Sequence, residues 1–168
     1  MPRSACLSRD RHALRRKTDD AGLAPVSLRA QAFRLLARRE YARAELEQRL
    51  LAKGASGYDL RALLDELEGQ GYLSNERYAR AIASQKAGRY SRRSIAAELR
   101  AKGVKSDDIA AALAEVSPDD TVALAELWRR RFGVAPASER EKARQVRFLQ
   151  TRGFAVAAIL KLLREVGR

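Results

Sequence analysis

The sequence has almost none of the residues that support cysteine or histidine chemistry. Its 168 residues include one cysteine, Cys6, and one histidine, His12. A single cysteine excludes an intrachain disulfide framework or a cysteine metal site within one chain. Beyond residue 27 there is no histidine to act as a general base or a metal ligand. We therefore expect a non-enzymatic protein of a reducing cytoplasm, with no catalytic residues, metal or cofactor.

Long apolar runs are also missing. No stretch approaches the ~18 apolar residues that a membrane-spanning helix requires. The first residues, MPRSACLSRDRHALRRK, lack the apolar core of a secretory signal. The sequence predicts a protein that does not enter a membrane and stays in the cytoplasm.

Aromatic residues and prolines are scarce, and the charge is strongly one-sided. Aromatics make up 6% of the chain and prolines number four, against 46% hydrophobic and 33% charged residues, which is typical of a soluble helical protein. The 34 Lys and Arg exceed the 21 Asp and Glu, giving a net charge of +13. Nucleic acid is the expected polyanionic partner, and an anionic membrane is the weaker alternative.

Apolar periodicity divides the chain into an arm and a helical body. Residues 1–27 show no sustained periodicity and predict a flexible basic N-terminal arm. From Leu28 onward apolar residues recur at three- and four-residue spacing, with no strand alternation. The expected helices are 28–39, 43–53, 57–70, 75–87, 91–102, 106–115, 119–131, 138–151 and 155–166.

Three glycines reveal an internal repeat. Gly54, Gly103 and Gly153 each follow a helical stretch that ends in a basic residue, as C-cap glycines do, and lie 49 and 50 residues apart. A leucine stands four positions before each glycine, and Leu60, Ile109 or Ile159 stands six after it. The register predicts an all-α fold of three tandem three-helix repeats, 28–73, 74–117 and 118–168, stacked into an elongated, curved body.

Acidic residues near the expected helix starts have an ordinary explanation. Asp107, Asp108, Asp119 and Asp120 stand at first turns, where side-chain oxygens and negative charge stabilise the free backbone N–H groups. We expect caps at these positions and no metal ligands.

The middle of the chain resembles a known family. The stretch LEGQGYLSNERYARAIASQKAGRYSRRSIAAELRAKGV (67–104) is similar to the central part of RecX proteins, through Gly71-Tyr72-Leu73, Glu76-Arg77-Tyr78-Ala79, Glu98-Leu99 and Lys102-Gly103-Val104. The end of the chain resembles the family again at Arg147-Phe148-Leu149 and Arg152-Gly153-Phe154. The resemblance covers roughly residues 30–166. One departure is Ser74-Asn75, where the family usually has an acidic pair.

The resemblance implies a function as well as a fold. RecX proteins are three-repeat helical regulators that bind along the groove of a RecA filament on DNA. The resemblance therefore implies a monomer that contacts the RecA recombinase filament and single- and double-stranded DNA. It also implies negative regulation of strand exchange, ATP hydrolysis and co-protease activity, within DNA repair and the SOS response.

Arginine stripes are the candidate contact surface. Arg93 and Arg100 share one face of the second repeat's middle helix, and Arg140, Arg144 and Arg147 share one face of the third repeat's. Guanidinium groups bridge phosphates or pair with carboxylates, so either DNA or protein is a suitable partner. The full candidate set is Arg89, Arg93, Arg100, Lys102, Arg140, Arg144, Arg147, Arg152, Tyr78 and Tyr90. The alternative interpretation is that these arginines form solvated faces and that the tyrosines pack in the core.

Two other functions fit the composition. A general DNA-binding helical-repeat protein without a recombinase partner would owe all its activity to binding bare DNA. A scaffold for acidic proteins would bind no DNA at physiological salt. A filament regulator differs from both of these, because its affinity for a recombinase filament is well above its affinity for bare DNA.

Overall fold

The computed structural model describes residues 27–116 and 119–167, and all regular secondary structure in this part of the chain is α-helical. This confirms the predicted all-α class. The N-terminal arm, with Cys6 and His12, lies outside the described residues except for Ser27. The helices are α1 (Leu28–Leu36), α2 (Arg43–Leu51), α3 (Gly57–Gly69), α4 (Asn75–Lys86), α5 (Arg92–Ala101), α6 (Ser106–Val116), α7 (Asp120–Arg131), α8 (Glu139–Thr151) and α9 (Val156–Val166).

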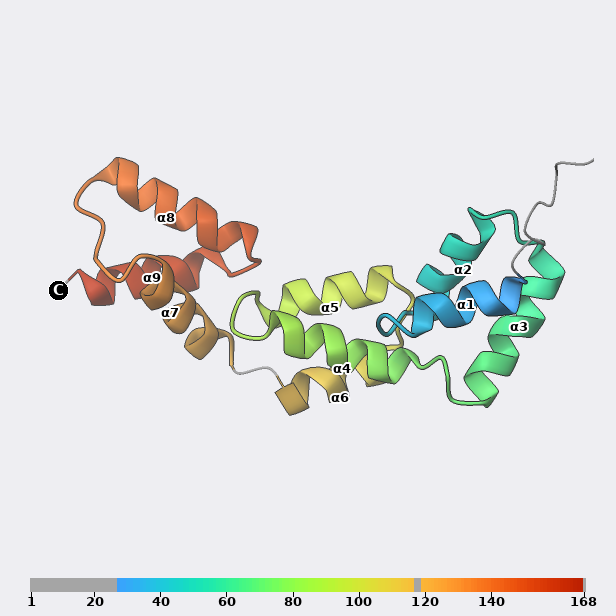
Figure 1. Ribbon diagram of the computed structural model, residues 1–168. Helices are drawn as coiled ribbons and strands as arrows, with labels where there is room; N and C mark the ends of the chain where they lie inside the picture. The colour runs from blue at the N-terminus through green and yellow to red at the C-terminus, as the bar shows by residue number, and fades with distance from the viewer. Residues whose placement is uncertain (1–26, 117–118, 168) are drawn as a thin grey trace, which may run out of the picture.

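The helices form three groups in an elongated row, α1 to α3, α4 to α6 and α7 to α9 (Figure 1). Each group has its own apolar core. Leu50, Leu99 and Leu149, the leucines of the predicted register, are fully buried in these three cores. Three tandem three-helix repeats are therefore confirmed, whereas the limits 28–73, 74–117 and 118–168 stay predictions.

The predicted helix starts agree with the structure to within one residue, but α1 ends three residues early, at Leu36 instead of residue 39. The reason lies beyond the helix, where Arg39 makes tertiary contacts. Its guanidinium hydrogen bonds to the Glu45 carboxylate at 2.7 Å and lies 3.8 Å from the centre of the Tyr41 ring. These contacts hold Arg39 in the turn to α2 and compete with another helical turn.

The three register glycines have the backbone conformation that their position predicts. The φ angles of Gly54, Gly103 and Gly153 are +89°, +76° and +88°. This left-handed region costs a residue with a Cβ atom about 1 kcal/mol or more, and glycine avoids that cost. Each glycine ends the middle helix of its repeat and turns the chain toward the third helix.

A repeated hydrogen bond joins each repeat to the next. The first N–H of α2, from Arg43, donates to Asn75 Oδ1 on the first residue of α4 at 2.9 Å. In the same way, the first N–H of α5, from Arg92, donates to Asp120 Oδ1 on the first residue of α7 at 2.7 Å. Helix-start N–H groups lack partners within their own helix, so the following repeat supplies an acceptor at both joints.

The glycine turn of the following repeat completes each joint. A Cβ atom added to Gly103 would lie 3.6 Å from the Ala44 Cβ of α2, an ordinary contact. The second joint is tighter, because a Cβ atom on Gly153 would lie only 2.6 Å from both Ser91 Oγ and Ser94 Cβ. There the Ser91 hydroxyl donates to the Gly153 carbonyl at 2.8 Å, and the Ser91 N–H donates to the Arg152 carbonyl at 3.0 Å.

Gly153→Ala should destabilise the protein more than Gly54→Ala, although both glycines have nearly the same φ. Alanine at either position costs about 1 kcal/mol for the backbone conformation. Only at Gly153 does the added methyl also collide with the neighbouring repeat, and we expect a further destabilisation of about 1–3 kcal/mol. Chemical denaturation of the two variants measures the difference, and equal destabilisation would show that the second joint is not tightly packed.

Candidate interaction surface

The described residues contain no cluster of three or more His, Cys, Asp and Glu side chains able to hold a metal ion. Asp119 and Asp120, at the start of α7, both accept from backbone N–H groups. Asp119 caps α7 by accepting from the Thr121 N–H at 2.8 Å, and this hydrogen bond lowers the pKa of the Asp119 carboxyl. In the same described ranges, no helix is long and apolar enough to cross a membrane.

The arginine stripes lie on the surface of α5 and α8. Arg93 and Arg100 on α5 are exposed, as are Arg140, Arg144 and Arg147 on α8. Arg89, in the turn before α5, is exposed too. Within residues 27–116 and 119–167, none of these six guanidiniums has an ion pair or a hydrogen bond.

Other arginines of the chain are held by carboxylates. Arg29 pairs with Glu66 at 2.7 Å, and Arg77 pairs with Glu40 at 2.9 Å. Arg43 reaches both Asp65 and Glu68 at 2.6 Å. The stripe arginines, by contrast, are available to phosphates or carboxylates of a partner.

Arg152 and Tyr90 belong to the second joint. Arg152 donates a hydrogen bond to the Tyr90 hydroxyl, and its guanidinium lies 4.8 Å from the Tyr90 ring centre and 5.1 Å from that of Phe148. Both residues are half-buried. The structure thus gives them a packing role between repeats, and their contact with a partner stays a prediction.

Lys102 has the matching position at the first joint. It is half-buried at the end of α5, next to Gly103, and its charge acts on Glu45 of the first repeat. Burial by itself raises the pKa of Glu45, but the hydrogen bond and charge of Arg39, aided by Lys102, lower it below its ordinary value. Lys102 thus lies close to the first joint, and its contact with a partner stays a prediction.

Tyr78 is a correction to the predicted contact set. Its side chain is 3% exposed in the core of the second repeat, and burial, with the charges of Glu45 and Glu98, raises the pKa of its hydroxyl. A buried ring offers no face to a partner. The helical spacing of Tyr78 beside apolar residues is typical of a core position, so the alternative interpretation, that the tyrosines pack in the core, holds for Tyr78.

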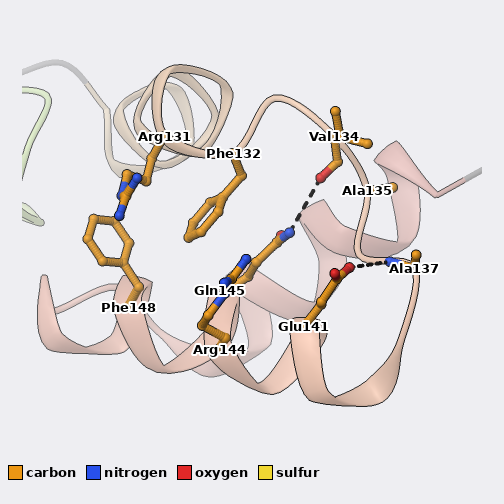
Figure 2. A pocket seen from close by; sticks show the side chains of 9 residues that line it. All are labelled: Arg131, Phe132, Val134, Ala135, Ala137, Glu141, Arg144, Gln145 and Phe148. Carbon is orange, nitrogen blue, oxygen red and sulfur yellow. Dashed lines mark hydrogen bonds between the residues drawn. The ribbon is translucent and has the colours of Figure 1, made fainter.

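The third repeat also contains a pocket of 540 Å³ that sequence analysis missed (Figure 2). Its lining residues include the apolar Phe132, Val134 and Ala135 and the cationic Arg131 and Arg144. It lies where α7, the loop that follows it and the start of α8 meet.

Gln145, on α8, holds the base of this pocket. It is 4% exposed, eight positions before Gly153, where the other two repeats bury Leu46 and Ile95. Its Oε1 accepts from Trp128 Nε1 at 2.8 Å, and its Nε2 donates to the Val134 carbonyl at 3.4 Å. A glutamine at a register position where the other two repeats have apolar residues was the sequence signal that could have revealed this pocket.

Comparison with known proteins shows the family. Models of the second and third three-helix domains of RecX match residues 74–113 and 119–163. The protein named "Regulatory protein RecX" from Chromobacterium violaceum is 45% identical over 137 residues, which cover 82% of this chain and 89% of that relative. The chain belongs to the RecX family. The resemblance seen in the sequence is confirmed.

Further relatives agree. The regulatory protein RecX of Leptothrix cholodnii is 39% identical over 139 residues, covering 83% of this chain and 88% of its own length. The crystal structure of RecX from Lactobacillus salivarius has a TM-score of 0.59 at 18% identity and covers 83% of this chain and 94% of that one. At such low identity the structural match shows the RecX fold alone.

The departure from the usual RecX sequence at Ser74-Asn75 keeps the local structure intact. Ser74 Oγ caps α4 by accepting from the Arg77 N–H at 3.2 Å. Asn75 supplies the acceptor of the first joint. Both tasks need only a side-chain oxygen, so the fold here does not need the acidic pair that is usual in the family.

Arg152→Ala should lower the free energy of unfolding by about 1–2 kcal/mol, because it removes a half-buried hydrogen bond and two cation–π contacts. Arg147→Ala, in the preceding helix, serves as the control. It removes an exposed, unpaired side chain and should change stability by less than about 0.5 kcal/mol. Thermal or urea unfolding compares the two, and an unchanged stability of Arg152→Ala would refute its role in the joint.

Proposed function

We propose that this chain is a non-enzymatic regulator that binds RecA recombinase filaments on DNA and inhibits them. The inhibited activities are strand exchange, ATP hydrolysis and co-protease activity, within DNA repair and the SOS response. The protein acts in the cytoplasm as a monomer without a cofactor. Membership of the RecX family supports the regulatory role, and the relatives carry the name of regulatory proteins.

The observation that carries the proposal is the pair of arginine stripes. They lie on α5 and α8, the middle helices of successive repeats, and their guanidiniums have no partner among the described residues. In Figure 1 both helices run along the upper edge of the row. Phosphates of DNA and carboxylates of a protein both suit such groups, and a nucleoprotein filament offers both.

The elongated body explains how modest contacts add up. Repeats that are joined in a row reach several sites of a helical filament at once, and linked contacts gain affinity through their high effective concentration. A body that spans neighbouring subunits hinders the entry of a second DNA and the growth of the filament. Inhibition then needs no chemistry from the regulator itself.

The decisive experiment compares inhibition with binding to bare DNA. DNA-dependent ATP hydrolysis and strand exchange by the cognate RecA are measured at fixed salt, alongside binding to the same DNA alone. We expect inhibition at concentrations well below those that coat the DNA. Inhibition that appears only when bare DNA is saturated would identify a general DNA-binding protein, and the filament function would be withdrawn.

Charge reversal tests the stripes. Arg93→Glu with Arg100→Glu, or Arg144→Glu with Arg147→Glu, should weaken filament binding by roughly tenfold or more, and should lower the slope of the salt dependence by about one for each phosphate that is no longer bound. Helix content and melting should stay nearly unchanged, because these side chains are exposed and unpaired.

The matched control reverses two exposed arginines of the first repeat, Arg34→Glu with Arg61→Glu. This variant has the same net charge as the stripe variants. If it weakens binding as much as they do, attraction is a property of the total charge and the stripes are only solvated faces.

A further inference from the structure

The pocket of the third repeat lies at the register positions that form the joints of the first two repeats. Ser91 and Ser94, which meet the glycine turn of the third repeat, stand 12 and 9 positions before Gly103. The residues 12 and 9 positions before Gly153 are Glu141 and Arg144, and both line the pocket. The pocket therefore lies on the part of α8 that corresponds to the joint surface of α5.

The first joint follows the same register. Ala42 and Glu45 stand 12 and 9 positions before Gly54. Ala42 is fully buried in the core of the second repeat. The charge of Lys102, from that repeat, acts to lower the pKa of the Glu45 carboxyl. In two of three repeats this surface is thus covered by protein, which indicates that the third surface is also suited to a protein occupant.

The first repeat of a second copy of the chain does not fit this surface of α8. Both joints need an acceptor on the first residue of the incoming helix, supplied by Asn75 and Asp120, but the first residue of α1 is Leu28. The N–H that corresponds to those of Arg43 and Arg92, 11 positions before Gly153, is that of Lys142, and it already donates to the Ser138 carbonyl at 2.9 Å. Just before α8, Glu141 Oε2 accepts from the Ala137 N–H at 2.9 Å (Figure 2).

The pocket chemistry favours an acidic and apolar occupant. Phe132 and Ala135 supply apolar side chains to the lining, whereas Val134 is 73% exposed. Arg131 and Arg144 line the same space, and neither has a carboxylate partner among the described residues. The one carboxylate of the lining, Glu141, accepts from the Ala137 N–H. An occupant with an apolar side chain next to a carboxylate satisfies both features, since charge-assisted hydrogen bonds to guanidinium are strong.

A nucleotide fits less well. Base stacking requires an open aromatic face, yet the Arg131 guanidinium lies 5.8 Å and 5.7 Å from the ring centres of Phe132 and Phe148, and Arg152 lies near Phe148 as well. Gln145, the amide that could recognise a base edge, already uses its Oε1 and Nε2 within the repeat.

We propose that this pocket binds a segment of a partner protein in which an apolar side chain lies beside one or more carboxylates. The segment takes the place that the glycine turn of the next repeat takes at the two internal joints. This site recognises a local peptide and does not depend on DNA, so it goes beyond the filament function and stands or falls separately from it.

Trp128 is a built-in reporter of the pocket. It is the single tryptophan of the chain, and its indole N–H donates to Gln145, which lines the pocket. The probe is an eight-residue peptide with one central phenylalanine among aspartates and glutamates, titrated into the full chain. We expect saturable movement of the indole N–H signal in NMR spectra, and an unmoved signal would overturn the proposal.

Matched peptides test the two parts of the motif. A peptide with serine in place of the phenylalanine should bind roughly tenfold more weakly, because it buries no ring. A peptide with asparagine and glutamine in place of the acids should also bind roughly tenfold more weakly, because a neutral amide binds guanidinium less strongly than a carboxylate does. Equal affinity of all three peptides would contradict the proposal.

Two variants of α8 separate the pocket from diffuse attraction. Arg144→Glu places a negative charge in the pocket and should weaken peptide binding roughly tenfold or more. Arg140→Glu makes the same charge change on the same helix outside the pocket lining and should weaken it much less. Equal weakening by the two variants would show attraction to total charge and overturn the proposal.

A single-stranded oligothymidylate is the nucleic-acid probe. We expect it to leave the Trp128 indole signal in place at concentrations where the peptide moves it. Movement by the oligonucleotide and none by the peptide would identify a nucleotide pocket instead. Either result leaves the recombinase measurements unaffected, because they do not depend on the peptide.

Discussion

The starts of two middle helices, α2 and α5, depend on the repeat that follows each of them. An α-helix begins with N–H groups that lack acceptors within the helix, and in this chain Asn75 and Asp120 provide acceptors from the next repeat for the first N–H groups of α2 and α5. The starts of α2 and α5 also pack against the glycine turns of the following repeats, at Gly103 and Gly153. Secondary structure and stacking of repeats are thus coupled, as expected where each unit is completed by its neighbour.

This coupling links the fold to the proposed function. The arginine stripes lie on α5 and α8, and the second joint fixes the beginning of α5 against the third repeat. Stripes on repeats that are held together present their charges in a constant arrangement, which multivalent binding to a regular filament requires. In the third repeat, the corresponding positions of α8 line a pocket and hold Glu141 and Arg144 in place of the two serines.

Local signals made the fold predictable from the sequence. The period of apolar residues and the three C-cap glycines depend on neighbouring positions only, and they indicated the helices of the described ranges and the three-repeat order. The joints were not predictable, because Asn75 and Asp120 act on residues 32 and 28 positions away while looking like ordinary helix-start residues. The contact set wrongly includes Tyr78, although its helical spacing beside apolar residues is typical of the core position that it has.

The central claim is that the joints hold the three repeats as one body. Its most direct test is a pulsed electron paramagnetic resonance distance measurement between spin labels on exposed positions of the first and third repeats, Ala62→Cys and Ala143→Cys, in a Cys6→Ser background. One narrow distance distribution, broadened when Asp120→Ala removes the acceptor of the second joint, is the predicted result. A broad distribution in the protein with intact joints would contradict the claim, because it would show repeats that move independently.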